Sequence, residues 1–137
     1  MALKTADHKG TTLVETMAAV LLFSLVMGSL LDVSLQSISM GKRSQYAYTA
    51  FNLAKNHIEK LRSMPFSSLV NAGEIDKYLD STGTPNAEGP FIRQTTVTPG
   101  YTNDQNLVRI QVSVNYLWKG TPSADTTQLT SVIFMYT

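Results

Sequence analysis

The chain has 137 residues, which is enough for one small domain and one membrane anchor. Only 15% of the residues are charged and the formal net charge is +1. Such a chain has no broad basic field that would hold nucleic acid, so nucleic acid is not expected as a partner. It contains no cysteine, which excludes disulfides and cysteine-based metal or redox sites.

A polar leader, residues 1–10, precedes an apolar run over residues 12–31. As an α-helix this run would be about 30 Å long at 1.5 Å per residue, which matches the hydrocarbon core of a bilayer. Lys4 and Lys9 predict that the N-terminus is cytoplasmic and that everything after the run is periplasmic or exterior. Glu15 lies in the opening turns, where a carboxylate is costly unless a partner pairs it, so we expect a functional role.

The stretch Gly10-Thr11-Thr12-Leu13-Val14-Glu15, with a lysine before it and the apolar run after it, resembles the processing site of type IV pilins and type II secretion pseudopilins. The resemblance implies that a prepilin peptidase cleaves between Gly10 and Thr11, that the new N-terminus at Thr11 is methylated, and that Glu15 serves assembly. Thr11 departs from the phenylalanine or methionine that the family prefers. This departure bears on methylation more than on cleavage, which depends chiefly on the glycine.

Residues 12–64 are predicted to form one long helix, with Gly28-Ser29 as its weakest point. In the second half, apolar residues recur at spacings of three and four and form a one-sided stripe, made up of Ala47, Ala50, Phe51, Ala54, Ile58 and Leu61. His57 lies among charged residues and is interpreted as a solvated helix residue. Pro65 is expected to end the helix, because it disfavours the α conformation at the residue before it.

Residues 67–90 are rich in Ser, Gly, Asn and Pro and are predicted to be a connector with a short helical turn at 74–80. Three strands are expected after it, at 91–98, 107–119 and 127–136. In the second strand the apolar side chains alternate and face one way, namely Val108, Ile110, Val112, Val114, Tyr116 and Trp118. We expect this face to cover the apolar stripe of the helix.

The predicted fold class is therefore α+β. A long N-terminal helix, transmembrane in its first half, packs by its second half on a small antiparallel sheet of about three strands. The resemblance implies the same architecture. The expected organisation is a cleaved leader at 1–10, a transmembrane and filament-core helix at 11–41, and a pilin-like head at 42–137. The head joins the second half of the helix, the connector 67–90 and the sheet 91–137.

The segment 50–66 also resembles minor pilins and I-type pseudopilins, which often carry a Glu-x-Leu-Arg sequence before a proline. The resemblance implies a minor type IV pilin, a structural subunit that is assembled into a type IV pilus or primes one. The implied partners are prepilin peptidase, the major pilin and other minor pilins or pseudopilins, the inner-membrane assembly platform and membrane lipid. The implied location is the bacterial inner membrane, single-pass with a periplasmic C-terminus, and then the pilus or a periplasmic pseudopilus.

Three alternatives stay open: a type II secretion pseudopilin, an adhesin or DNA-uptake subunit on such a fibre, and a monomeric membrane-anchored domain. A binding subunit would need an exposed aromatic or basic cluster, and the sequence shows only scattered Lys77, Arg93, Arg109 and Lys119. A lone anchor would gain nothing from Glu15. No catalytic constellation, metal site or cofactor motif can be assembled from the residues, so no cofactor is expected and the protein is expected not to be an enzyme.

Overall fold

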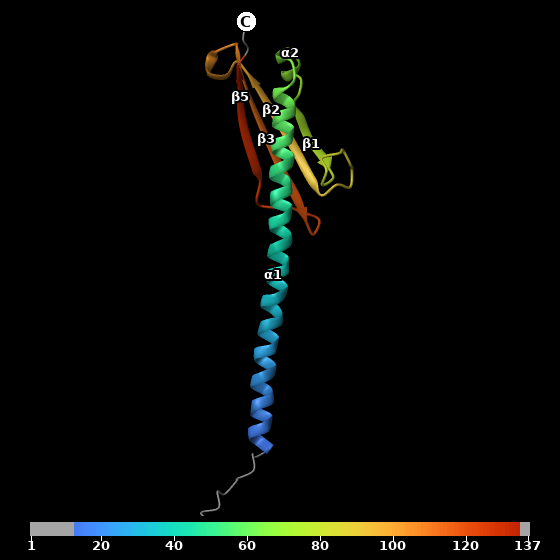
Figure 1. The fold of residues 1–137 in the computed structure, drawn as a ribbon, viewed down its shortest axis with the longest axis vertical. Coiled ribbons are helices and arrows are strands. Elements are labelled where there is room, and N and C mark those ends of the chain that lie inside the picture. The colour runs from blue at the N-terminus through green and yellow to red at the C-terminus, as the bar shows by residue number, and fades with distance from the viewer. Residues whose placement is uncertain (1–12, 135–137) are drawn as a thin grey trace, which may run out of the picture. The chain divides into compact units, whose positions relative to one another are not determined.

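The structure is a computed structural model of the chain, and it describes residues 13–134 (Figure 1). The chain divides after Gly41 into two compact units. We call the described part of the first unit, residues 13–41, the stem. We call the described part of the second unit, residues 42–134, the head. One helix, α1 (Leu13–Arg62), contributes its first part to the stem and its second part to the head.

The stem is helical throughout, and α1 continues through Gly28 and Ser29 without a break. The helix predicted over 12–64 is thus confirmed to within about two residues at each end. The hydroxyls of Ser24 and Ser29 donate to backbone carbonyls four and three residues earlier, at 2.8 Å each. These bonds satisfy polar groups inside the helix, so an apolar environment need not supply partners for them.

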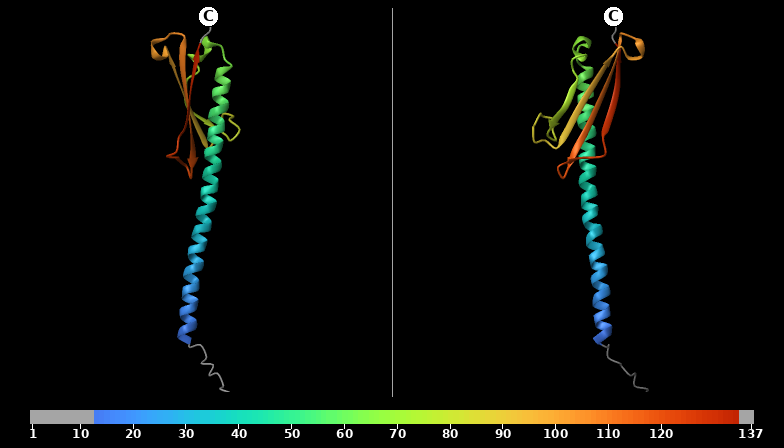
Figure 2. Two further views of the ribbon diagram at one scale, coloured as in Figure 1. Left: turned by 60° about the vertical axis from the view of Figure 1, so that its left-hand side comes forward. Right: turned by 180° about the vertical axis from the view of Figure 1, so that it is seen from behind.

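The head contains one antiparallel sheet of five strands and the second part of α1 as two layers (Figure 2). The strands are β1 (Glu74–Leu79), β2 (Phe91–Pro99), β3 (Leu107–Trp118), β4 (Thr121–Pro122) and β5 (Thr127–Phe134). The order is β1-β2-β3, and both β5 and the short β4 pair with β3. Two short helices, α2 (Phe66–Leu69) and η1 (Tyr101–Asn103), lie in the connections.

The three predicted strands are confirmed as β2, β3 and β5, and residues 135–136 of the third lie outside the described residues. The helical turn predicted at 74–80 is wrong, because this segment is the edge strand β1. A bulge between Glu74 and Lys77, with Asp76 at φ 45°, interrupts the alternation that would have marked a strand. Pairing with β2, in the register Lys77 opposite Arg93, supplies the backbone partners that make the segment extended.

The predicted packing of the β3 face on the helix is confirmed. The alternate β3 side chains from Val108 to Tyr116 are at most 2% exposed and form one apolar cluster with α1. Trp118 is partly buried against the same cluster. The helix stripe needs one correction, because Phe51 is 43% exposed, whereas Leu53 and His57 are buried. The covered face of α1 therefore includes Leu53 and His57. The strand β1 and the loop after it cover these two residues.

The loop after β1 folds back on that strand. The amide of Asn86 donates to the Tyr78 carbonyl at 3.1 Å, and Leu79 forms an isolated bridge with Pro85. Gly89 packs so closely on the Leu79 backbone that a Cβ atom there would clash with the Leu79 carbonyl. These contacts fix the loop 80–86 next to α1, where Gly83 lies against Leu53.

Candidate functional site

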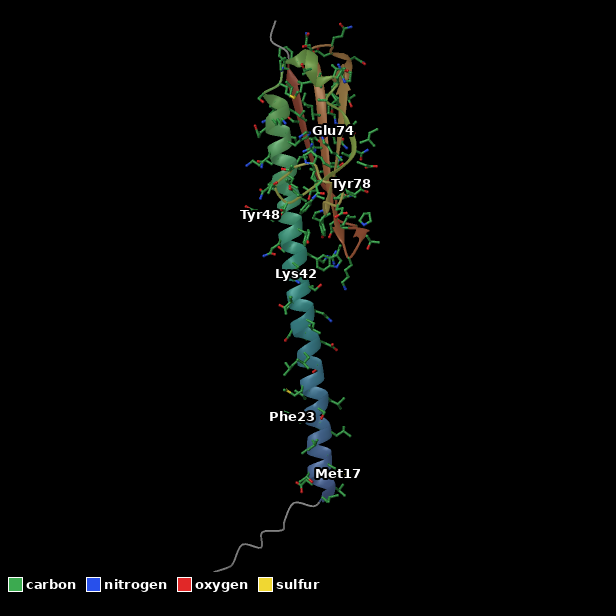
Figure 3. All side chains as sticks on the ribbon, turned by 90° about the vertical axis from the view of Figure 1, so that its right-hand side faces the viewer. Met17, Phe23, Lys42, Tyr48, Glu74 and Tyr78 are labelled. Atoms are coloured by element: carbon green, nitrogen blue, oxygen red, sulfur yellow. The ribbon has the colours of Figure 1, made fainter. Side chains whose placement is uncertain are left out.

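The stem presents apolar side chains on all sides of the helix. Every large apolar residue from Leu13 to Met40 is at least 47% exposed within the structure. Figure 3 shows two of these side chains, Met17 and Phe23, extending from the helix. The helix is long and apolar enough to cross a membrane, by length and composition. A helix that is apolar all round requires lipid or other apolar helices around it.

Glu15 is placed by the structure in the first turn of α1 and is exposed there. Leu13, Val14, Met17 and Ala18 near it in the sequence are apolar or small, and the one polar residue among them is Thr16, whose hydroxyl donates to the Leu13 carbonyl at 2.9 Å. A carboxylate in the first turn interacts favourably with the positive end of the helix dipole. Gly10 and Thr11, the predicted cleavage and methylation residues, lie outside the described residues.

Sequence reasoning missed a second candidate site, at which α1, β1 and β2 of the head meet. We call it the charged cluster: His57 and Lys60 of α1, Glu74 and Lys77 of β1, and Arg93 of β2. Glu74, labelled in Figure 3, is its central acid. Glu74 Oε1 accepts from Lys77 Nζ at 2.8 Å, and Oε2 lies 2.9 Å from Arg93 Nε and 2.7 Å from Arg93 Nη2.

Two members of the charged cluster, Arg93 and His57, are buried, and Glu74 between them is partly buried. Arg93 is 8% exposed, which is rare for an arginine unless an acid pairs it. Burial by itself would raise the pKa of Glu74, but the hydrogen bonds from Lys77 and Arg93 outweigh it and lower this pKa below its usual value. Glu74 is therefore ionised at neutral pH, and it ties β1 to β2.

His57 corrects the sequence interpretation, because it is 9% exposed and not solvated. Burial, helped by the positive charge of Arg93, lowers the pKa of His57 to about 4, although Glu74 opposes this shift. The imidazole is consequently neutral at pH 7. Its Nε2 lies 3.6 Å from Glu74 Oε2, too far for a hydrogen bond, and has no hydrogen-bond partner among the described residues.

One signal in the sequence could have revealed the charged cluster. In the predicted strand 91–98, alternation places Arg93 and Thr95 on the same face as Phe91, and this is the face that is buried in β2. An arginine on an inward face requires a buried acid. The acid itself could not have been chosen, because Glu74 was assigned to a helical turn in the connector.

The described residues define a class of protein: an α+β head joined to an apolar helix long enough to span a bilayer. Within residues 13–134 no group of three or more His, Asp or Glu residues could hold a metal ion. Comparison with protein-family models finds no match, and neither the curated proteins nor the solved structures include a significant match to this chain.

Proposed function

We propose that this protein is a minor type IV pilin, a structural subunit that prepilin peptidase processes and that enters or primes a fibre. The observation that carries the proposal is the exposed apolar stem. It is the first part of α1, and the second part of the same helix belongs to the folded head. Water-exposed apolar surface costs about 25 cal/mol per Å². Lipid before assembly and neighbouring subunit helices after assembly would each remove that cost, and the same side chains suit both environments.

Glu15 is the proposed docking residue. Cleavage after Gly10 would create a cationic α-amine at Thr11, and methylation would leave its charge in place. In an apolar fibre core an unpaired charge is costly, whereas a paired charge is held strongly. We infer that Glu15 of one subunit pairs with the Thr11 amine of the next subunit and so fixes the axial register between helices.

The adhesin or DNA-uptake alternative has less support from the head. Of the four scattered cations, Arg93 and Lys77 are bound to Glu74. The guanidinium of Arg109 lies 5.6 Å from the centroid of the Tyr101 ring. Three of the four thus already have partners within the head. A type II secretion pseudopilin would place the same apolar side chains in lipid and in a fibre core. We propose no enzymatic role for this protein, whether it is a minor pilin or a pseudopilin.

Fibre incorporation tests the proposal. Glu15→Gln keeps the side-chain shape and removes the charge, so we expect normal insertion and cleavage but strongly reduced recovery in sheared fibres at matched membrane levels. The matched control is Asp32→Asn, which removes the other acid of the stem and should be incorporated like wild type. Equal incorporation of both variants would contradict a docking role for Glu15.

Processing is tested separately. Mass analysis of the membrane-extracted protein should give a chain that begins at Thr11, and Gly10→Val should accumulate as the uncleaved precursor. A mature chain that retains Lys9 would contradict processing by prepilin peptidase, and with it the family assignment.

A further inference from the structure

A hollow of about 250 Å³ lies beside the charged cluster in the head. All five members of the charged cluster line it, and Leu53 and Asn56 of α1 add to the wall. Thr82, Gly83 and Pro85 of the loop border it. The loop is held in place by Asp80, whose Oδ1 accepts hydrogen bonds from the amides of Thr82 and Thr84 at 2.8 and 2.9 Å. The hollow is therefore bordered by ordered backbone and not by a free loop.

Arg93 has donors left after it binds Glu74. A guanidinium carries five N–H groups in a planar fork. Nε and Nη2 each direct one toward Glu74 Oε2, and the Arg93 side chain makes no other hydrogen bond within residues 13–134. The remaining N–H groups are on Nη1 and Nη2, the edge of the fork that matches a planar carboxylate bidentately. Since Arg93 lines the hollow, these are the polar groups that it has to offer there.

The charge balance of the hollow favours an anion. Its lining holds three cations, Lys60, Lys77 and Arg93, against the single carboxylate of Glu74. Lys60 forms no ion pair with any described residue, and Lys77 retains donors beyond its bond to Glu74. Unbalanced positive charge beside a buried guanidinium raises the local concentration of anions and strengthens their binding over that in bulk water.

We propose that this hollow binds a carboxylate group, either of a small free organic acid or of an acidic side chain on another protein. The open edge of Arg93 would take both carboxylate oxygens, and Lys60 and Lys77 would neutralise the charge. The volume is below the roughly 300–1,000 Å³ of sites for drug-sized ligands, which suits one small acid or one side chain. The proposal does not rest on fibre assembly, because no stem residue takes part.

The test uses the full-length protein in detergent micelles, with backbone amides of the head followed by NMR at pH 7 and constant ionic strength. The probes are succinate, the blocked peptide acetyl-Gly-Glu-Gly-amide, and inorganic phosphate. We expect saturable shifts around Lys77 and Arg93 with at least one of the two carboxylate probes. Saturation by succinate assigns a free acid as the ligand, and saturation by the peptide alone assigns a protein side chain.

Variants locate the site. Lys60→Glu should weaken carboxylate binding by roughly tenfold or more, which is about 1.4 kcal/mol. Lys55→Glu makes the same change of charge on the same helix at an exposed residue outside the hollow, and should leave binding within about twofold, or 0.4 kcal/mol. Arg93→Lys keeps the charge but loses the fork, and should weaken binding at least as much as Lys60→Glu.

Three outcomes overturn the proposal: no saturable shift with either carboxylate at millimolar concentration, equal weakening by Lys60→Glu and Lys55→Glu, or tighter binding of phosphate than of both carboxylates. Fibre incorporation measured on the same Lys60→Glu variant keeps this test separate from the proposed function. Normal incorporation together with lost carboxylate binding supports the hollow and leaves the stem proposal untouched.

Discussion

The stem and the head use the same helix in two different ways. In the stem, α1 is apolar on every side and its large side chains are exposed, whereas in the head it is apolar on one side and that side is covered by the sheet. The head therefore owes its stability to its own core. The stem has no such core, so its exposed apolar side chains require apolar surroundings, such as lipid or other apolar helices.

Charge follows the same division. The stem contains two ionisable side chains, Glu15 and Asp32, and neither is placed in a protein core. The head buries Arg93 and pairs it with Glu74, and the buried His57 beside them is neutral at pH 7. The buried charge of the head is thus paired within the chain, whereas the proposed role of Glu15 in the stem needs a partner subunit. The two regions should respond differently to the same substitution.

The largest expected effect is the loss of the head core. Val112 of β3 is fully buried, so Val112→Asp places an unpaired carboxylate among apolar side chains and should destabilise the head by about 4 kcal/mol or more. Urea unfolding of a soluble fragment 42–137, followed by circular dichroism, measures it. Gln111→Asp, one residue away on the other face of β3, should change stability by only about 0.5 kcal/mol. Equal unfolding of both variants would refute the two-layer core.

A leucine-to-alanine pair on α1 sharpens the comparison directly. Leu61 in the head is 3% exposed, and Leu61→Ala should cost about 2–5 kcal/mol through lost burial and a cavity. Leu21 in the stem is 61% exposed, and Leu21→Ala should leave the thermal unfolding of the head unchanged. The measurement is near-ultraviolet circular dichroism of the full-length protein in micelles, which reports on Trp118 and its neighbours. Comparable losses from both substitutions would show that stem and head are not independent.

The smallest expected effect is a pH dependence that belongs to the head alone. The pKa of His57 is about 4 in the folded head, against about 6.5 when unfolded, so the unfolded chain takes up the proton first as the pH falls. The stability from neutral His57 is therefore complete above about pH 6.5 and is lost between pH 6.5 and 4, with a slope of at most about 1.4 kcal/mol per pH unit. Glu74 contributes its own loss at lower pH, because its pKa is lowered from that of a free carboxyl.

Urea unfolding of the fragment 42–137 at several pH values between 7 and 5 checks this dependence. His57 is the only histidine of that fragment, so His57→Gln should flatten the slope in this window. An unchanged slope in His57→Gln would mean that another group is responsible. The full-length protein should show the same slope, because every member of the charged cluster belongs to the head.

The elements whose pattern is local could be predicted from the sequence. The apolar run defined the stem, the spacings of three and four and Pro65 defined the length of α1, and strict alternation defined β3 and its buried face. Helical and extended periods are properties of neighbouring residues, so they can be read without knowing the fold. The function of a minor pilin comes from the resemblance around Gly10 and Glu15, and it stays a proposal.

The tertiary structure alone decided which face of α1 is covered, that residues 74–79 form a strand, and that His57 is buried. Each depends on contacts between segments that are far apart in the chain. The bulge at Asp76 hides the extended pattern of β1, and only pairing with β2 makes the segment a strand. Once β1 and its loop lie beside α1, the cover extends to Leu53 and His57, and Glu74 meets Arg93. A charged cluster built from three elements cannot be read from any one of them, because its physical basis is the distance between side chains.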